Sequence, residues 1–305
     1  MIYDIPKIEF FKKFQKASAI NKTDDVVWVW CAYDLLKKNK FGMSEWNWLY
    51  HMGVECFEKL YNRFYDPNDG LYYGQPSFVD VGGGGYPDGW NNTSIEARNK
   101  CVWVKAASTN CLYYKALKSM GKAAEILGLK KEAQEWIRKA EALKKAIKKE
   151  LCFPEGTLAY FKHRDNHLED RRDILGSSFA VLCGVAEDDE ARKLLKGYPI
   201  TPYGVPILYP FYERNDTYHN NAMWPFANTF FLLAMEKAYK KDYSYINMHM
   251  MLNDVVNGHF AEVRDMQTNQ ACGAYSQLWS ITAFLNVCIR TDMTEISDEA
   301  KHTIL

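Results

Sequence analysis

A loop that holds two carboxylates and many aromatic rings is the part of the sequence best suited to do chemistry. It runs from Gly70 to Ser94, and the six glycines between positions 74 and 89, with two prolines, interrupt any helix or central strand. Asp80 or Asp88 could supply a proton, and flat faces for a sugar could come from Tyr72, Tyr73, Phe78, Tyr86 and Trp90. A long ordered loop is uncommon in a compact domain unless it has a function. Alternatively, the stretch is a glycine-rich connector whose aromatic side chains fill the core.

Helical hairpins are the elements expected to position this loop. Apolar residues recur at steps of three and four, most clearly over 129–151, where Lys and Glu fill the other face. Acidic residues at Asp24 and Asp25 favour a helix start there, although the β-branched residues that follow would also suit a strand. Helices are predicted over 9–19, 24–38, 46–64, 100–127, 129–151, 171–185, 187–195, 222–240, 243–256 and 275–289. Hairpins that recur every roughly 40 to 70 residues indicate an all-α fold, an (α/α)6 toroid of five to six hairpins whose polar and aromatic loops gather at one rim.

Composition limits the classes of partner. The chain has 305 residues and no linker-like stretch, so we expect a single domain over 1–305. Thirty-eight Lys plus Arg balance thirty-eight Asp plus Glu, which argues against a nucleic-acid or anionic-membrane surface. The eight cysteines contain no CxxC pair and are expected to be reduced. No signal architecture or apolar run of about 20 residues occurs, so a cytoplasmic location is expected unless a leader was removed.

A second informative stretch runs from Gly258 to Ser280. Its order of Glu262, Asp265 and Thr268, followed by Gly273 and an aromatic-Ser helix start, resembles the general-base segment of the six-hairpin, (α/α)6-barrel glycosidases. That group includes processing α-glucosidase I, mannosylglycerate hydrolase and the glucosidase domain of glycogen debranching enzymes. Residues 218–226 are similar to the His-Asn-x-x-x-Trp-Pro helix entry of the group, and residues 69–80 are similar to its acid-bearing loop. The resemblance covers roughly residues 20 to 290 and is specific for the superfamily, not for a substrate.

The resemblance implies an inverting glycoside hydrolase that removes a terminal α-linked sugar. Asp80 would be the general acid and Glu262 the general base, which in inverting enzymes lie roughly 6.5–9.5 Å apart. Apolar or uncharged residues flank Asp80, so burial is expected to raise its pKa as an acid requires. Asp88 is the alternative acid. The chain departs from the glucosidase I branch at Asn91, where that branch has an acidic residue. No counterpart of the N-terminal β-sandwich domain common among these enzymes is expected within these residues, which could be a fragment or a pared-down catalytic domain.

Around this pair, polar and aromatic residues are candidate sugar contacts. They are Asp24, Asp25, Trp28, Asp88, Trp90, Asn92, Lys105, Asn110, His219, Asn220, Trp224, Gln277 and Trp279. For Asp24 and Asp25 the alternative is a helix cap, and for Trp224 and Trp279 it is core packing. Lys105 and Asn110 are better candidates, because a polar side chain within an apolar helix must find a partner.

Other functions remain open from the sequence alone. A catalytically silent carbohydrate-binding relative would keep the aromatic rim and lack a working acid. A polysaccharide lyase on the same toroid would use Tyr218 and His219 as its base. The glycine run at 82–85 lacks the Lys-Ser/Thr of a phosphate loop, and His163 and His167 have metal-like spacing but flank a charged loop. We therefore expect no metal and no cofactor, an oligosaccharide as the partner, and no nucleic acid or membrane.

Overall fold

The computed structural model describes residues 24–39, 41–80, 82–90, 94–201, 203–214, 218–243 and 259–290. These residues form two compact units, each of which is described by itself. Unit 1 comprises the described parts of Met1–Phe78, Asn99–Leu151 and Phe161–Leu168, and unit 2 those of Val79–Arg98, Cys152–Tyr160 and Glu169–Leu305. The short helix α4 (Ile95–Val102) crosses the boundary between them. The expectation of a single domain stays a prediction.

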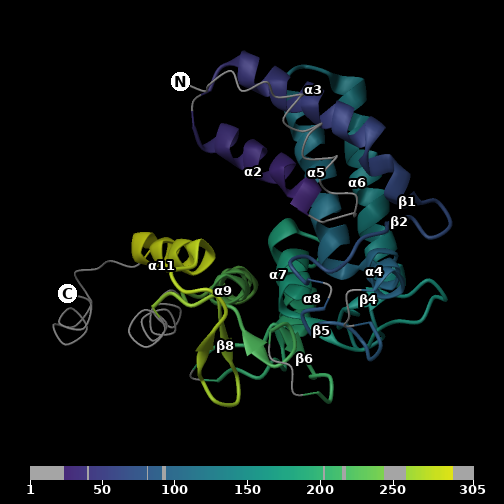
Figure 1. Ribbon diagram of the computed structural model, residues 1–305. Helices are drawn as coiled ribbons and strands as arrows, with labels where there is room; N and C mark the ends of the chain where they lie inside the picture. The colour runs from purple at the N-terminus through teal and green to yellow at the C-terminus, as the bar shows by residue number, and fades with distance from the viewer. Residues whose placement is uncertain are drawn as a thin grey trace. The chain divides into compact units, whose positions relative to one another are not determined.

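Unit 1 is built around two antiparallel helices, α5 and α6, which lie side by side in Figure 1. In α6 the residues Ala133, Trp136, Ala140, Leu143 and Ile147 are buried on one face, as the spacing of the apolar residues predicts. Gly128, with φ +76°, makes the turn between the two helices. The elements of this unit are α2 (Asp24–Lys38), α3 (Met43–Lys59), η1 (Tyr61–Phe64), β1 (Tyr65–Asp66), β2 (Leu71–Tyr72), β3 (Lys105–Ala106), α5 (Ala107–Ile126), α6 (Lys130–Glu150) and β4 (Phe161–Lys162).

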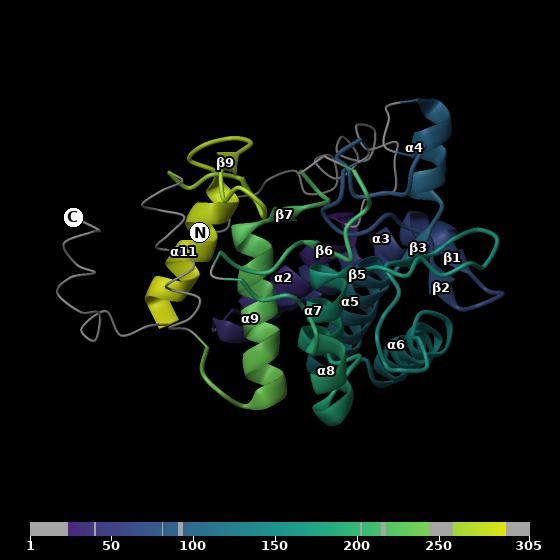
Figure 2. The ribbon, with the colours of Figure 1, turned by 90° about the horizontal axis from the view of Figure 1, so that it is seen from below.

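Unit 2 repeats one local plan, in which a short strand leads into a helix. Asp173, the last residue of β5, caps α7 by accepting a hydrogen bond from the backbone N–H of Leu175. Pro225 occupies the first turn of α9, where its missing N–H has no cost. Helix α9 packs against α7 and α11, and Figure 2 shows α9 beside α11. The elements are β5 (Arg172–Asp173), α7 (Ile174–Cys183), α8 (Asp188–Leu195), β6 (Leu208–Tyr209), β7 (Ala222–Met223), α9 (Pro225–Tyr239), β8 (Val263–Asp265), β9 (Ala271–Cys272) and α11 (Leu278–Arg290).

Short antiparallel strands stand where several predicted helices were expected to begin. The strand pairs are β1–β2 and β3–β4 in unit 1, with β5–β6 and the three-stranded β7–β8–β9 in unit 2. Lys105 and Ala106 pair with Lys162 and Phe161, which interrupts the helix predicted over 100–127. The predicted helices over 171–185, 222–240 and 275–289 likewise begin later, at 174, 225 and 278, and the helix over 46–64 ends at Lys59. Hydrogen bonds to distant segments override the helical pattern at these positions.

The remaining predictions on secondary structure have mixed outcomes. The helices predicted over 24–38, 129–151 and 187–195 are confirmed within a residue or two. Within its described residues, the loop over 70–94 contains only the short strand β2 as a regular element. The helices predicted over 9–19 and 243–256 lie outside the described residues, apart from Tyr243. Among the described helices, none combines the length and the apolar character needed to cross a membrane.

Candidate functional site

Glu262, immediately before β8, is held by hydrogen bonds on both carboxylate oxygens. The hydroxyl of Tyr218 donates to Oε1 over 2.9 Å, and the side-chain amide of Gln277 donates to the same oxygen over 3.3 Å. The backbone N–H of Ala274 donates to Oε2 over 3.0 Å. The side chain is half-buried. These donors fix the direction in which the carboxylate points, which a group that takes a proton from water requires.

A glycine makes this position of Glu262 possible. Gly273, between β9 and α11, has φ +74°, in the left-handed region that suits glycine. A Cβ atom placed on Gly273 would lie 2.4 Å from Oε2 and 2.9 Å from the Cβ of Glu262. The chain therefore passes closely behind the carboxylate, and the absent side chain leaves room for it.

Three aromatic rings form a compact cluster beside Glu262. The rings of His219 and Trp224 are stacked, with centroids 5.1 Å apart and an interplanar angle of 6°. The ring of Tyr218 meets both edge-on, at 4.6 Å and 4.9 Å. The indole N–H of Trp224 donates to the backbone carbonyl of Tyr218 over 2.8 Å. Because His219 and Trp224 are buried, this cluster forms a rigid support for the Tyr218 hydroxyl.

Asp80 approaches the same cluster from the glycine-rich loop. Its Oδ2 lies 3.8 Å from Nε2 of His219. The backbone N–H of His219 donates to the carbonyl of Gly83 over 2.7 Å, and a Cβ on Gly83 would lie 2.3 Å from the imidazole. The loop thus packs directly on His219. The expectation that its neighbours bury the Asp80 side chain is wrong, because 66% of that side chain is exposed, whereas the adjacent Val79 packs into the core.

The pKa of Tyr218 is raised by its burial and by both candidate carboxylates. Burial raises its pKa most, the hydrogen bond to Glu262 raises it further, and the negative charges of Glu262 and Asp80 add to the effect. Asp80 lies beside His219 and Glu262 accepts from Tyr218, so these carboxylates, 182 positions apart in the sequence, lie at one aromatic cluster. The assignment of these two carboxylates to one catalytic site, and their roles as acid and base, stay predictions.

Asp88, the alternative acid, lies at the surface and is engaged by a cation. Its Oδ1 lies 2.6 Å from Nη1 of Arg214, and 85% of its side chain is exposed. Arg214 also donates to the backbone carbonyl of Gly84 and covers the ring of Tyr212 at 4.8 Å. Arg214 thereby links Gly84 and Asp88 of the glycine-rich loop to its own segment, which includes Tyr212. Sequence reasoning missed this arginine, because nothing in its own neighbourhood marks it.

Comparison with known proteins decides the family. The family model of the mannosylglycerate hydrolase MGH1-like glycoside hydrolase domain matches residues 69–280. The chain belongs to this glycoside hydrolase family. The match contains Asp80, Asp88 and Glu262, and the resemblance to the six-hairpin glycosidases and the all-α toroid class are both confirmed.

Solved structures that resemble the chain share its fold at low sequence identity. Neutral trehalase from Saccharomyces cerevisiae has a TM-score of 0.61 at 11% identity, covering 84% of this chain and 58% of that one. The GH78 family rhamnosidase of Bacillus sp. GL1 has a TM-score of 0.57 at 17% identity, covering 84% of this chain and 25% of that one. A sialidase has a TM-score of 0.61 at 17% identity, covering 85% and 25%. The chain thus spans less than two thirds of the length of each of these proteins. A search of curated proteins found no match to its sequence.

Within the glycoside hydrolase domain, the other candidate contacts of unit 2 differ in what they do. Gln277 holds Glu262, and Trp279 is 52% exposed with its ring 5.4 Å from that of Phe226. Trp90 is partly buried in the loop beside Asp88. Asn220 is buried and bonds the backbone N–H and carbonyl of Tyr212, so it braces the chain. Asn92 lies outside the described residues.

The candidates in unit 1 are engaged with other residues of that unit. Asn110 exchanges hydrogen bonds with the backbone of Tyr72 and donates to the carbonyl of Ala106. The indole N–H of Trp28 donates to the hydroxyl of Tyr61 over 3.1 Å. Lys105 forms ion pairs with two aspartates. Asp24 and Asp25 lie in α2, but their side chains are outside the described part of the structure.

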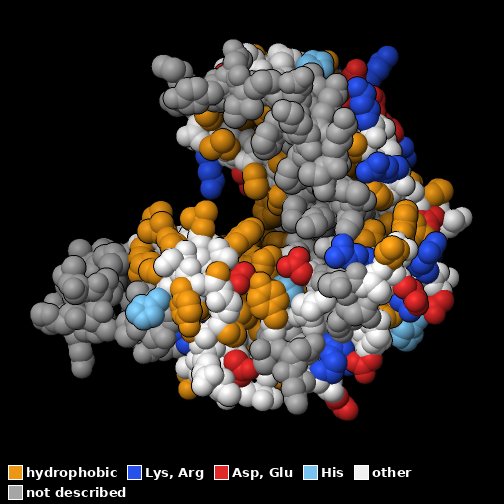
Figure 3. Space-filling view, viewed as in Figure 1, with side chains coloured by type: hydrophobic (Ala, Val, Ile, Leu, Met, Phe, Trp, Pro, Cys, Tyr) orange, Lys and Arg blue, Asp and Glu red, His pale blue; other side chains and the backbone are white. Residues whose placement is uncertain are grey.

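Exposed apolar side chains gather on α11, as the space-filling view shows (Figure 3). Leu278, Trp279, Leu285 and Ile289 are between 52% and 84% exposed. Trp279 lies at the start of the helix, two residues after Gln277. Leu278 directly follows Gln277 and is the member of this group nearest in sequence to the residues that hold Glu262.

Proposed function

We propose that this protein is an inverting glycoside hydrolase that removes a terminal α-linked sugar from an oligosaccharide. The observation that carries the proposal is the set of three hydrogen bonds that the two carboxylate oxygens of Glu262 accept. A second carboxylate, that of Asp80, lies at the same aromatic cluster. Family membership supports the reaction class. The α linkage and the attack on a chain end rest on the sequence resemblance alone.

In this proposal Glu262 acts as the general base. It accepts a proton from a water molecule whose oxygen attacks the anomeric carbon, while the bond from that carbon to the glycosidic oxygen breaks. The raised pKa of Tyr218 keeps the phenol protonated at neutral pH, so it remains a donor to Glu262. The same property disfavours a lyase in which Tyr218 removes a proton from the substrate, because a base must first lose its own.

Asp80 is the proposed general acid, which donates its proton to the departing glycosidic oxygen. Its exposure lets the carboxyl group reach a bound substrate. The imidazole of His219, which stacks on Trp224, lies 3.8 Å from the Asp80 carboxyl group. Asp88 is less suited to this role, because its carboxylate already pairs with Arg214. One displacement at the anomeric carbon inverts its configuration.

The decisive experiment follows the anomer of the released sugar by proton NMR. The substrates are a panel of α-linked disaccharides and aryl α- and β-glycosides, given to the wild type and to Asp80→Asn, Glu262→Gln and Asp88→Asn. We expect an inverted product from the wild type, its loss in the first two variants, and activity close to wild type in the third. A product of retained configuration would overturn the single displacement.

Leaving-group dependence separates the two roles. A dinitrophenolate departs without protonation, so Asp80→Asn should hydrolyse a dinitrophenyl glycoside far better than a disaccharide, while Glu262→Gln should fail on both. Equal losses on both substrates in Asp80→Asn would remove Asp80 from the acid role. Ultraviolet absorbance of an unsaturated product would indicate a lyase. Sugar binding without turnover, unchanged in both variants, would indicate a silent binding protein.

A further inference from the structure

Unit 1 contains a polar pocket of about 720 Å³ that shares no residue with the cluster around Glu262. Its walls come from the β1–β2 hairpin, β3, the last turn of α6, and β4 with the turn that follows it. Charged and polar groups dominate the lining, among them Asp66, Asp69, Lys105, Glu150, Lys162 and Arg164. Nothing in the proposed hydrolysis uses this pocket.

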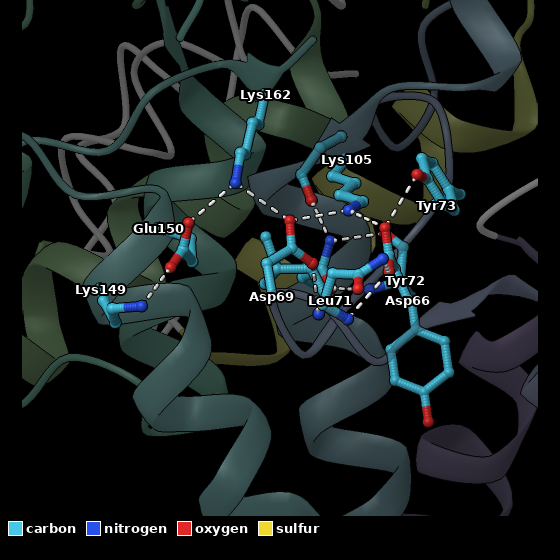
Figure 4. Close-up of polar contacts among 12 residues, drawn as sticks. Asp66, Asp69, Leu71, Tyr72, Tyr73, Lys105, Lys149, Glu150 and Lys162 are labelled. Carbon is cyan, nitrogen blue, oxygen red and sulfur yellow. Dashed lines mark hydrogen bonds and ion pairs between the residues drawn. The ribbon is translucent and has the colours of Figure 1, made fainter. Parts of the chain in front are cut away.

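Two almost fully buried lysines form the floor of the pocket (Figure 4). Lys105 donates to Asp66 and Asp69 over 2.7 Å each, and Lys162 donates to Asp69 over 3.0 Å and to Glu150 over 2.8 Å. Only 7% of each lysine side chain is exposed. The two ammonium groups share one oxygen of Asp69, so donors and acceptors alternate along the floor.

Of the two lysines, Lys162 keeps a hydrogen beyond those given to its carboxylates, whereas Lys105 also engages Tyr73. An ammonium carries three hydrogens, and within the described residues the Nζ atoms of Lys105 and Lys162 each donate to two carboxylates. The Nζ of Lys105 also lies 4.4 Å from the centre of the Tyr73 ring, another lining residue. A hydroxyl that accepts from a lysine and donates to the adjacent carboxylate would fit this alternation.

The charges of the lining select against ionic ligands. Lys105, Lys149, Lys162 and Arg164 stand against Asp66, Asp69 and Glu150, four cations against three anions. The sequence over 66–70 is rich in oxygen ligands, as calcium loops are, but the Lys105 ammonium already occupies the space between the two aspartates. An anion would find three of the four cations, Lys105, Lys149 and Lys162, already paired with carboxylates. A neutral ligand with several hydroxyl groups meets neither penalty.

An aromatic wall adds to this arrangement. Tyr73 lines the pocket, and its ring meets that of Trp103, which is 36% exposed, at 5.4 Å. The guanidinium of Arg164 lies 5.8 Å from the Trp103 ring. Cations already lie over Tyr73 and Trp103, so the lining itself offers a pyranose the Tyr73 ring beside paired donors and acceptors.

We propose that this pocket is a second carbohydrate-binding site, which takes one neutral sugar unit through adjacent hydroxyls bound by Lys162 and by the carboxylates paired with the two lysines. The choice of a sugar as the ligand class rests on the proposed function. The site itself uses none of the residues assigned to hydrolysis, so its variants leave cleavage of a short aryl glycoside unchanged.

Hydrogen–deuterium exchange locates the site. The full chain carrying Glu262→Gln is titrated to about 50 mM with glucose, mannose and rhamnose, and with glucuronate and glucosamine as charged counterparts, which covers the millimolar Kd that a few hydrogen bonds support. We expect protection over residues 66–73 and 161–168 with at least one neutral sugar, and less with its charged counterpart. Protection confined to residues 218–224 and 259–277, or none at all, would overturn the proposal.

Variants test the lysines directly. Lys162→Met should weaken the affinity of the bound sugar by about tenfold or more, because a charged donor is lost. Arg164→Ala, at an exposed position that folding tolerates, should weaken it by about threefold. Lys122→Met is the matched control, since this exposed lysine of the same unit pairs with Glu125 away from the pocket. Unchanged sugar affinity in both pocket variants would refute the second site. If the wild type does not hydrolyse the aryl glycoside at all, only the proposed function is refuted.

Discussion

Replacing Gly273 by Ala tests whether the position of Glu262 controls activity. The new methyl group would lie 2.4 Å from Oε2 of Glu262 and 2.9 Å from its Cβ, whereas ordinary contacts begin at 3.4 Å. The carboxylate must therefore retreat by 1.0 Å and the Cβ by 0.5 Å, the differences between those distances. Rotating the side chain relieves the first contact only, so the backbone before β8 must also move.

The expected effect follows from these displacements. A misplacement of about 1 Å in a catalytic group can cost about 100-fold in rate, so we expect kcat/KM to fall by about that factor. The hydrogen bond from the N–H of Ala274 to Oε2, now 3.0 Å, should weaken as well. In addition, an alanine in the left-handed region costs about 1–2 kcal/mol of unfolding free energy.

A matched glycine separates the loss of activity from the loss of stability. Gly128, at the α5–α6 turn, has φ +76°, close to the +74° of Gly273, and none of the described residues lies within 4 Å of a Cβ built on it. Gly128→Ala should therefore lose a similar free energy of unfolding, measured by urea denaturation, and keep its hydrolytic rate. If Gly273→Ala hydrolysed a disaccharide as fast as Gly128→Ala, the reasoning that makes Glu262 the base would fail.

Three further changes probe the contacts of the two units. Tyr218→Phe removes a hydrogen bond to Glu262 worth about 1.5–3 kcal/mol, so kcat/KM should fall about 10- to 100-fold; a loss below about threefold in steady-state assays would contradict the role of the phenol. Lys105→Met leaves Asp66 and Asp69 without their shared ammonium and should cost about 3–5 kcal/mol in urea unfolding, whereas a loss under about 1 kcal/mol would show that the pair is dispensable. The hydrogen bond from Lys105 lowers the pKa of Asp66 in the folded chain below its ordinary value of 3.8. The ionised Asp66 carboxylate should therefore stabilise the fold fully at neutral pH and lose this contribution as the pH falls below 3.8. Unfolding free energies that stay constant from about pH 6 to about pH 3 would contradict this.

The helices could be predicted from apolar spacing, but several of their first residues could not. The clearest pattern, over 129–151, gave α6 within one residue at each end. The long helix expected over 100–127 is broken because Lys105 and Ala106 hydrogen-bond to β4, more than fifty positions away in the sequence. Such long-range strand contacts leave no periodic pattern in the sequence. The polar or apolar character of these residues is also the same whether they form a strand or a helix.

Candidate residues of the site could be chosen by type, but their partners could not. Asn110 and Asn220 have the amides expected of sugar ligands, yet each is buried and bonded to the backbone of a neighbouring segment. A buried amide must be satisfied, and the folded chain satisfies these two itself. Tyr218 shows the opposite case, because its position in the motif suggested a base and its contact makes it the donor that holds Glu262.

The glycines connect these observations at both carboxylates. Within the loop over 70–94 they indicated an interrupted chain, which is what local conformation requires. The structure gives Gly83 and Gly273 a further meaning, since a Cβ on the first would strike the imidazole of His219 and a Cβ on the second would strike Glu262. The supports of Asp80 and Glu262 thus depend on two absent side chains, at Gly83, 136 positions from His219, and at Gly273, 11 positions from Glu262. Titratable residues indicate which groups could react, but only the fold shows which glycines let them approach one another.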